Sequence, residues 1–237
     1  MDHRRRTRSR VLALLALAVP LALVGCAASE PVQQDETGAS APATSPESSP
    51  SASADVDTSG WLEYATHDGD LTYRYTADWT LESTTGQDAE GTSRWFDSAT
   101  LTAPNGQVLL QSYDLVDLGG ACGGPERFQP LEILATEPLE GAASDTTIAT
   151  VALRSVDGRW TFGMGLVGGD LPTTDTCVVH FTASTSDGGF LLGTTTTITS
   201  NGDDPLWTVD TLDDATAYMQ TDEYATLLEI LRSVRTA

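Results

Sequence analysis

The sequence predicts an α+β domain in which helices pack on an antiparallel β-sheet, with an all-β sandwich bearing terminal helices as the alternative. Three observations predict this fold. Apolar and polar residues alternate with period two along several runs between residues 71 and 198, as in half-buried strands. Turn sequences such as Asn105-Gly106 and Asp157-Gly158 separate these runs. The period then changes to that of a helix near the C-terminus, and strands followed by helices are typical of α+β domains.

The first half of the domain is predicted to form strands joined by short turns. The run at 71–76 begins it, and 79–84 could pair back onto that run after a turn at Ala77-Asp78. Asn105-Gly106 between two apolar runs predicts a β-hairpin. A loop rich in Gly and Pro, which holds Cys122, extends to about Pro130. The strands predicted in this half are residues 71–76, 79–84, 95–102, 107–115 and 132–136.

The second half is predicted to be an antiparallel meander that ends in helices. Its four strands are residues 147–155, 160–168, 176–184 and 190–198. Thr211 and Thr221 are expected to cap two helices, the first of which ends near Met219. The second helix carries an apolar stripe that should lie on the sheet, formed by Tyr224, Leu227, Leu228, Leu231 and Val234.

Residues 1–25 are predicted to be a cleaved signal peptide, with an uncleaved membrane anchor as the alternative. Five arginines precede an apolar run, Val11 to Val24, that is shorter than the roughly 20 residues needed to span a bilayer. The run leads into Leu23-Val24-Gly25-Cys26, a tetrapeptide that resembles the bacterial lipobox. This resemblance implies cleavage between Gly25 and Cys26 and a diacylglycerol thioether on Cys26. Because two acyl chains anchor a protein stably, we expect it at the cell membrane, on the extracytoplasmic face.

The composition divides the remaining chain into two parts. Residues 26–59 consist mostly of Ser, Ala, Pro, Thr and acidic residues, which predicts a disordered tether behind the lipidated cysteine. Residues 60–237 have the length and composition of a single globular domain. With Cys26 lipidated, Cys122 and Cys177 remain, and in an exported protein they are predicted to form a disulfide. A reactive Cys122 in its glycine-rich stretch is the alternative.

The charge of the chain is strongly negative. The sequence has 12 arginines, no lysine and 34 acidic residues, which gives a formal net charge of −22. Removal of residues 1–25 takes away five arginines and Asp2, so seven basic and 33 acidic side chains remain, with a net charge of −26. Nucleic-acid binding depends on Lys and Arg that neutralise phosphates, so we expect no nucleic-acid partner. The field could favour cationic partners, although solubility is the simpler explanation.

The sequence contains none of the usual catalytic motifs, such as Gly-x-Ser-x-Gly, Ser-x-x-Lys, His-Glu-x-x-His or Cys-x-x-Cys. His67 lies in a predicted turn and His180 in a strand, where we expect structural roles. The prediction is a non-catalytic binding or assembly domain with no cofactor or metal, whose partner is an envelope protein or a cell-wall component. The alternatives are an envelope hydrolase that uses a carboxylate pair such as Asp68 and Asp70, and a solute-binding lipoprotein.

The positions of the five tryptophans predict which of them are buried. Trp79, Trp95 and Trp160 lie in strand contexts and are expected in the core, whereas Trp61 and Trp207 lie at element edges, where an exposed indole could contact a sugar or a partner.

Two segments resemble PsbP-like domains. The aromatic strand of Leu71–Trp79 is similar to the start of the family, with Thr76 at its usual proline position. The ending Tyr224–Val234, with Leu231-Arg232-Ser233, is similar to its closing helix. The resemblance implies an antiparallel sheet flanked by helices and a binding or assembly role, and it transfers no functional residue.

Overall fold

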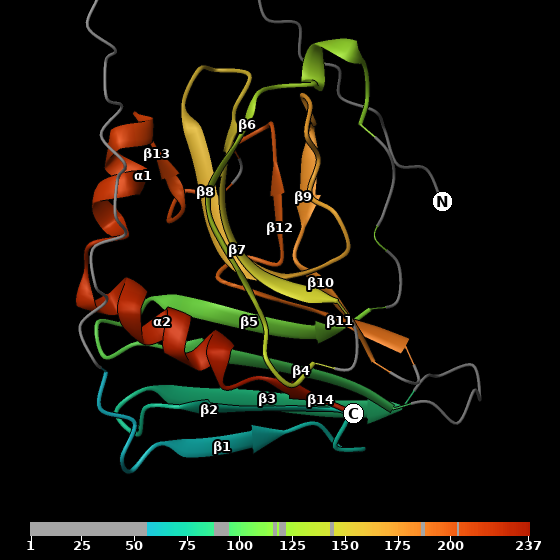
Figure 1. Cartoon of the computed structure of the whole chain (residues 1–237), viewed down its shortest axis with the longest axis vertical. Helices are drawn as coiled ribbons and strands as arrows, with labels where there is room; N and C mark the ends of the chain where they lie inside the picture. The colour runs from blue at the N-terminus through green and yellow to red at the C-terminus, as the bar shows by residue number, and fades with distance from the viewer. Residues whose placement is uncertain are drawn as a thin grey trace, which may run out of the picture. The chain divides into compact units, whose positions relative to one another are not determined.

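The computed structural model describes residues 56–87, 95–115, 118, 122–142, 145–185, 188–202 and 204–237. The predicted signal peptide, Gly25 and Cys26 of the lipobox and all but the last residues of the predicted tether lie outside the described residues. In the part that is described, strands dominate and two helices follow near the C-terminus (Figure 1).

Nine strands form a large antiparallel sheet, which we call the main sheet. Its order is β3-β4-β5-β11-β8-β7-β6, with β10 beside β11 and β13 beside β8. The hairpin predicted at Asn105-Gly106 joins β4 to β5, and Gly106 has a φ of 85°, which favours glycine. The strands are β3 (Thr80–Gln87), β4 (Trp95–Thr102), β5 (Val108–Asp114), β6 (Leu131–Pro138), β7 (Thr146–Arg154), β8 (Trp160–Gly168), β10 (Thr182–Thr185), β11 (Gly188–Gly193) and β13 (Thr208–Val209).

Two smaller antiparallel sheets accompany the main sheet. One consists of β1 (Leu62–Ala65), β2 (Leu71–Tyr75) and β14 (Arg235–Thr236), in the order β1-β2-β14. The other pairs β9 (Val178–His180) with β12 (Thr197–Thr199). Chain segments from opposite ends of the domain therefore meet at β2 and β14.

Both predicted helices are present. Helix α1 (Leu212–Tyr218) begins after Thr211, whose side chain and that of Asp214 form a reciprocal capping box. Helix α2 (Asp222–Arg232) begins after Thr221, whose hydroxyl accepts from the Tyr224 N–H. The predicted stripe is confirmed, since all five of its side chains are buried: Tyr224, Leu227, Leu228, Leu231 and Val234.

Other elements pack on both faces of the main sheet, and a separate hydrophobic core lies at each face. On one face, β1, β2 and α2 contribute to the larger core, together with Leu101, Leu110 and Leu192 of the main sheet. On the other face, the β9–β12 pair covers β7 and β8 through a smaller core of Ala149, Val151, Leu153, Val167, Val179, Phe181 and Ile198. Strands β7 and β8 are therefore buried on both faces.

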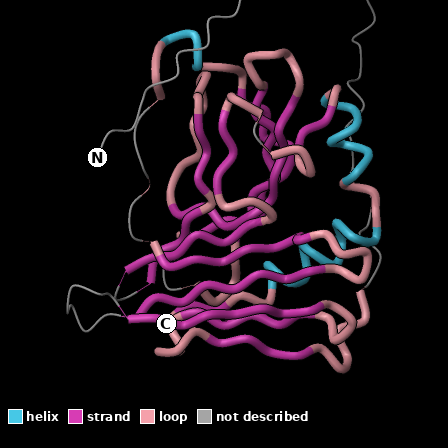
Figure 2. Tube along the Cα trace, turned by 180° about the vertical axis from the view of Figure 1, so that it is seen from behind, coloured by secondary structure: helices cyan, strands magenta, loops and turns pink. Residues whose placement is uncertain are grey.

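The domain is mostly antiparallel sheet, so the all-β alternative with terminal helices describes it better than the α+β class. Figure 2 shows helical residues only in one short turn and the C-terminal pair among the described residues. The last two strands of the predicted meander are wrong, because each of them divides into two strands. Residues 176–184 form β9 and β10, on either side of Phe181, and residues 190–198 contribute to β11 and β12. Strand β9 pairs with β12, and β10 pairs with β11. Residues 79–84 also do not pair back onto 71–76, because β3 pairs with β4 in the main sheet.

The tryptophans depart from expectation in three places. Trp79 is buried, as predicted, whereas Trp95 and Trp160 are only half-buried. Trp207 lies at an element edge, directly before β13, as predicted, but its indole is 3% exposed and makes edge-to-face contacts with Phe162 and Tyr218 instead of facing a sugar or a partner. Among the described residues no helix has both the length and the apolar character needed to cross a membrane.

Candidate functional site

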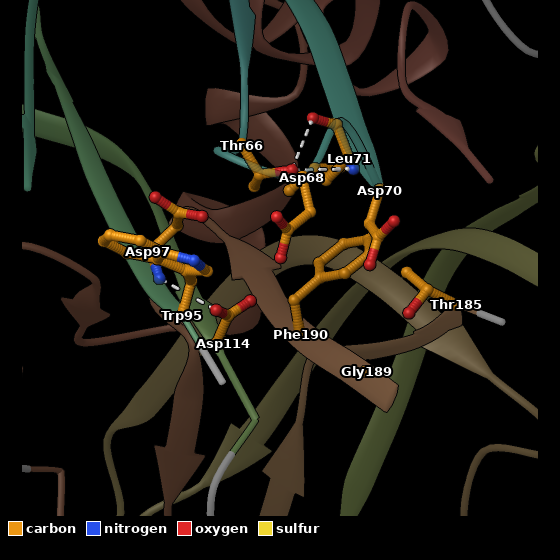
Figure 3. A pocket seen from close by; sticks show the side chains of 10 residues that line it. All are labelled: Thr66, Asp68, Asp70, Leu71, Trp95, Asp97, Asp114, Thr185, Gly189 and Phe190. Carbon is orange, nitrogen blue, oxygen red and sulfur yellow. Dashed lines mark hydrogen bonds between the residues drawn. The ribbon is translucent and has the colours of Figure 1, made fainter. Parts of the chain in front are cut away.

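A pocket of about 260 Å³ opens between the β1–β2 turn and one end of the main sheet (Figure 3). We call it the acidic pocket, because four of the described residues that line it are aspartates and none of them is Lys or Arg. The turn contributes one side, and β4, β5, β10 and β11 contribute the other. Its lining residues are Thr66, Asp68, Asp70, Leu71, Trp95, Asp97, Asp114, Thr185, Gly189 and Phe190.

Local hydrogen bonds shape the β1–β2 turn that carries Asp68 and Asp70. The Thr66 N–H donates to the Leu71 carbonyl at 3.0 Å, and the Leu71 N–H donates back to the Thr66 hydroxyl at 3.1 Å. The Gly69 N–H closes the turn on the Thr66 carbonyl at 3.0 Å, and Gly69 has a φ of 77°, which favours glycine. The turn thus projects Asp68 into the space above Asp114 and Phe190, as Figure 3 shows.

Asp97 joins this turn to the main sheet. Its side chain is 8% exposed and accepts hydrogen bonds from the His67 N–H at 2.9 Å and from the Thr85 hydroxyl. The Asp97 N–H in turn donates to the Asp114 carboxylate at 2.8 Å. These contacts connect the turn with β3, β4 and β5, so the geometry of the acidic pocket depends on Asp97.

The carboxylates influence a neighbouring phenol. Burial is the largest cause of the raised pKa of Tyr64, which is about 12, and the negative charges of Asp97 and Asp114 contribute to the same rise. Tyr64 is 7% exposed and packs on Tyr73 with ring centroids 5.0 Å apart. The phenol of Tyr64 therefore stays neutral near two of the carboxylates that line the pocket.

Trp95 supplies an aromatic surface at the pocket. Its indole lies against the imidazole of His67, with ring centroids 4.2 Å apart and planes inclined by 35°. The half-buried indole lines the pocket beside Asp97 (Figure 3). The prediction that Trp95 packs in the core is therefore wrong in its detail. An indole face attracts cations, so Trp95 and the carboxylates favour the same kind of ligand.

The residues predicted from sequence are distributed over the domain. Asp68 and Asp70, named as a possible carboxylate pair, both line the acidic pocket. Cys122 and Cys177 form the predicted disulfide, with Cα atoms 5.9 Å apart, away from that pocket. His180 has the expected structural role, since its Nδ1 is 3.0 Å from the Thr197 hydroxyl and burial lowers its pKa.

Sequence reasoning missed Asp97 and Asp114. One signal was present for Asp97, which falls at an inward-facing position of the alternating run Asp97, Ala99, Leu101. A carboxylate at such a position is seldom buried without partners. Among the described residues, no group of three or more His, Cys, Asp or Glu side chains is arranged to hold a metal ion.

The chain was compared with protein-family models, curated proteins and solved structures, and none of them matches it.

Proposed function

We propose that this protein is a lipid-anchored binding protein of the cell envelope and that its acidic pocket holds an organic cation, an alkylammonium or guanidinium group. The observation that carries the proposal is the convergence of four carboxylates and one indole on a single pocket of about 260 Å³. The volume suits a small group or the end of a larger ligand, because pockets for drug-sized ligands begin at about 300 Å³.

The chemistry of the lining supports a cation over other ligands. Carboxylates accept charge-assisted hydrogen bonds from N–H donors, which are about twice as strong as those between neutral groups. The indole of Trp95 attracts the same charge through its π-face. The protein's net charge of −22 further concentrates cations near its surface.

The N-terminal sequence supports the location. The lipobox-like Leu23–Cys26 stretch is expected to attach lipid to Cys26, and residues 27–59 would span roughly 30 Å as a flexible chain. Such a tether would hold the domain where amine-bearing envelope proteins or cell-wall components can reach it. The resemblance to PsbP-like domains stays a prediction, and it agrees with a binding role.

The binding part is tested by titrating the full chain with n-butylammonium and following tryptophan fluorescence. We expect saturable binding that 1-butanol, which has no charge, does not reproduce. The variant D68N should bind about fivefold more weakly, as expected for loss of a partly exposed ion pair of about 1 kcal/mol. The matched control D170N removes an exposed aspartate outside the pocket and should bind like the wild type.

Equal binding of butanol and butylammonium would overturn the cation proposal, as would equal affinities of D68N and D170N.

The alternative of a carboxylate hydrolase is favoured by one observation, the placement of Asp68 and Asp70 in one pocket. Turnover of a cell-wall polymer that is lost in D68N but kept in D170N would establish that alternative. The anchor is tested separately, because labelled fatty acid should be incorporated into the wild type and not into C26S.

A further inference from the structure

A second cavity of about 260 Å³ lies beside the disulfide and shares no residue with the acidic pocket. We call it the Arg127 cavity. One side comes from Cys122, Gly123 and Arg127, at the end of the glycine-rich stretch and in the 3₁₀ turn that follows it. The other side comes from the strand pair β9–β12 and the residues next to it: Cys177, Val178, Thr199, Ser200 and Asn201.

The charge of this cavity is opposite to that of the protein as a whole. Among the described residues that line it, Arg127 is the one charged residue and none is Asp or Glu. The ion pairs recorded among the described residues engage Arg159 and Arg232, not Arg127. The Arg127 guanidinium instead donates to the side-chain oxygen of Asn201, a neutral partner that leaves its positive charge uncompensated by that contact.

Several contacts hold Arg127 in place before any ligand arrives. The Cys122–Cys177 disulfide ties the segment to the start of β9. Gln129 and Thr176 exchange two backbone hydrogen bonds of 2.8 and 2.9 Å. Arg127 itself ends a 3₁₀ turn in which its N–H donates to the Gly124 carbonyl at 3.1 Å. Ligand binding therefore has little ordering entropy to offset, which favours affinity.

We infer that the Arg127 cavity binds a small monocarboxylate with a short apolar tail. A guanidinium presents several N–H donors in a planar fork that matches a carboxylate, and the bond to Asn201 uses only one of its nitrogens. The amide of Asn201 carries further N–H donors next to it. Val178 and the disulfide supply apolar surface for the tail. In a chain this acidic, an anion needs such a local cation to approach.

The experiment titrates the full chain, with the disulfide intact, with sodium butyrate and separately with butyramide, using calorimetry. Butyramide has nearly the same shape but no charge, so we expect it to bind at least about tenfold more weakly, as loss of a charge-assisted hydrogen bond predicts. The variant R127Q should lose butyrate affinity by a similar factor. The matched control R154Q removes an exposed arginine that does not line the cavity and should bind like the wild type.

The competing role for Arg127 is purely structural, in which it only fastens its segment to Asn201. This role predicts that R127Q lowers the melting temperature and that butyrate and butyramide bind the wild type equally or not at all. That result would overturn the inference. If R127Q does not fold, the comparison of the two ligands on the wild type still decides. The inference does not depend on the acidic pocket, because D68N should bind butyrate as the wild type does.

Discussion

At the scale of single residues, Asp97 shows how a buried carboxylate can organise the site that it lines. It accepts from the His67 N–H and the Thr85 hydroxyl, so one side chain fixes the β1–β2 turn to β3 and β4. The turn in turn carries Asp68 and Asp70 into the acidic pocket. Asp97 thus has a positioning role, whereas Asp68, which is exposed, is free to meet a ligand.

This role predicts the effect of substitutions at Asp97. D97A leaves the His67 and Thr85 donors without their acceptor and should lower the free energy of unfolding by about 1–3 kcal/mol. Relief of repulsion among the carboxylates opposes this loss but is smaller, about 1 kcal/mol per close pair in water. D97N keeps one acceptor oxygen and should lose less. Urea unfolding measures both, with D170A as an exposed control, and equal stability of D97A and D170A would refute the role.

At the scale of elements, local sequence signals predicted where strands form better than they predicted which strands pair with each other. The hairpins β4–β5 and β7–β8 form as expected, because Gly106 and Gly158 mark short turns between neighbouring strands. The order around Phe181 was not predictable, since β9 and β10 find different partners through contacts far along the chain. For the same reason the pocket was not predictable: Asp68 and Asp114 are brought together by tertiary packing, which no local period records.

Strand β8 shows what the packing on both faces requires. A Cβ atom added at Gly165 would lie 2.5 Å from the Leu192 carbonyl oxygen and 2.6 Å from the ring of Phe181. The glycine therefore makes room for Phe181, which belongs to the smaller core. A Cβ atom added at Gly86, in the edge strand β3, would have no atom of the described residues within 4 Å.

The comparison of these two glycines gives a prediction at the element scale. G165A should lower the free energy of unfolding by about 1–3 kcal/mol or more, because a methyl group there forces backbone and ring to shift. G86A should be neutral or stabilise by up to about 1 kcal/mol, because alanine loses less conformational freedom in a strand than glycine. Chemical denaturation of both variants measures the difference. Similar values for the two would mean that Phe181 does not lie against β8 as the structure has it.

At the scale of the whole molecule, the composition and the burial of tyrosines predict how stability changes at alkaline pH. The chain has no lysine, its arginines stay charged, and Cys122 and Cys177 are disulfide-bonded, so tyrosines are the main side chains that titrate above pH 9. Burial is the largest cause that raises the pKa of four of them: Tyr64, Tyr73, Tyr218 and Tyr224.

The direction of the resulting pH dependence follows from these shifts. Tyrosines of the unfolded chain lose their protons near pH 10, whereas buried ones keep theirs to higher pH, as Tyr64 does to about pH 12. Above pH 10 the folded state therefore binds more protons than the unfolded state, and its stability falls as pH rises. Each such tyrosine contributes up to about 1.4 kcal/mol per pH unit in this range.

Urea unfolding between pH 8 and pH 11.5 should accordingly show stability that is constant up to about pH 9.5 and then declines. Absorbance of tyrosinate should show part of the phenols ionising only as the protein unfolds. Y64F removes one of the shifted groups and should make the decline shallower by that group's share. A stability that stays level to pH 11.5, or a Y64F variant with the slope of the wild type, would show that Tyr64 is not buried beside the carboxylates of the acidic pocket.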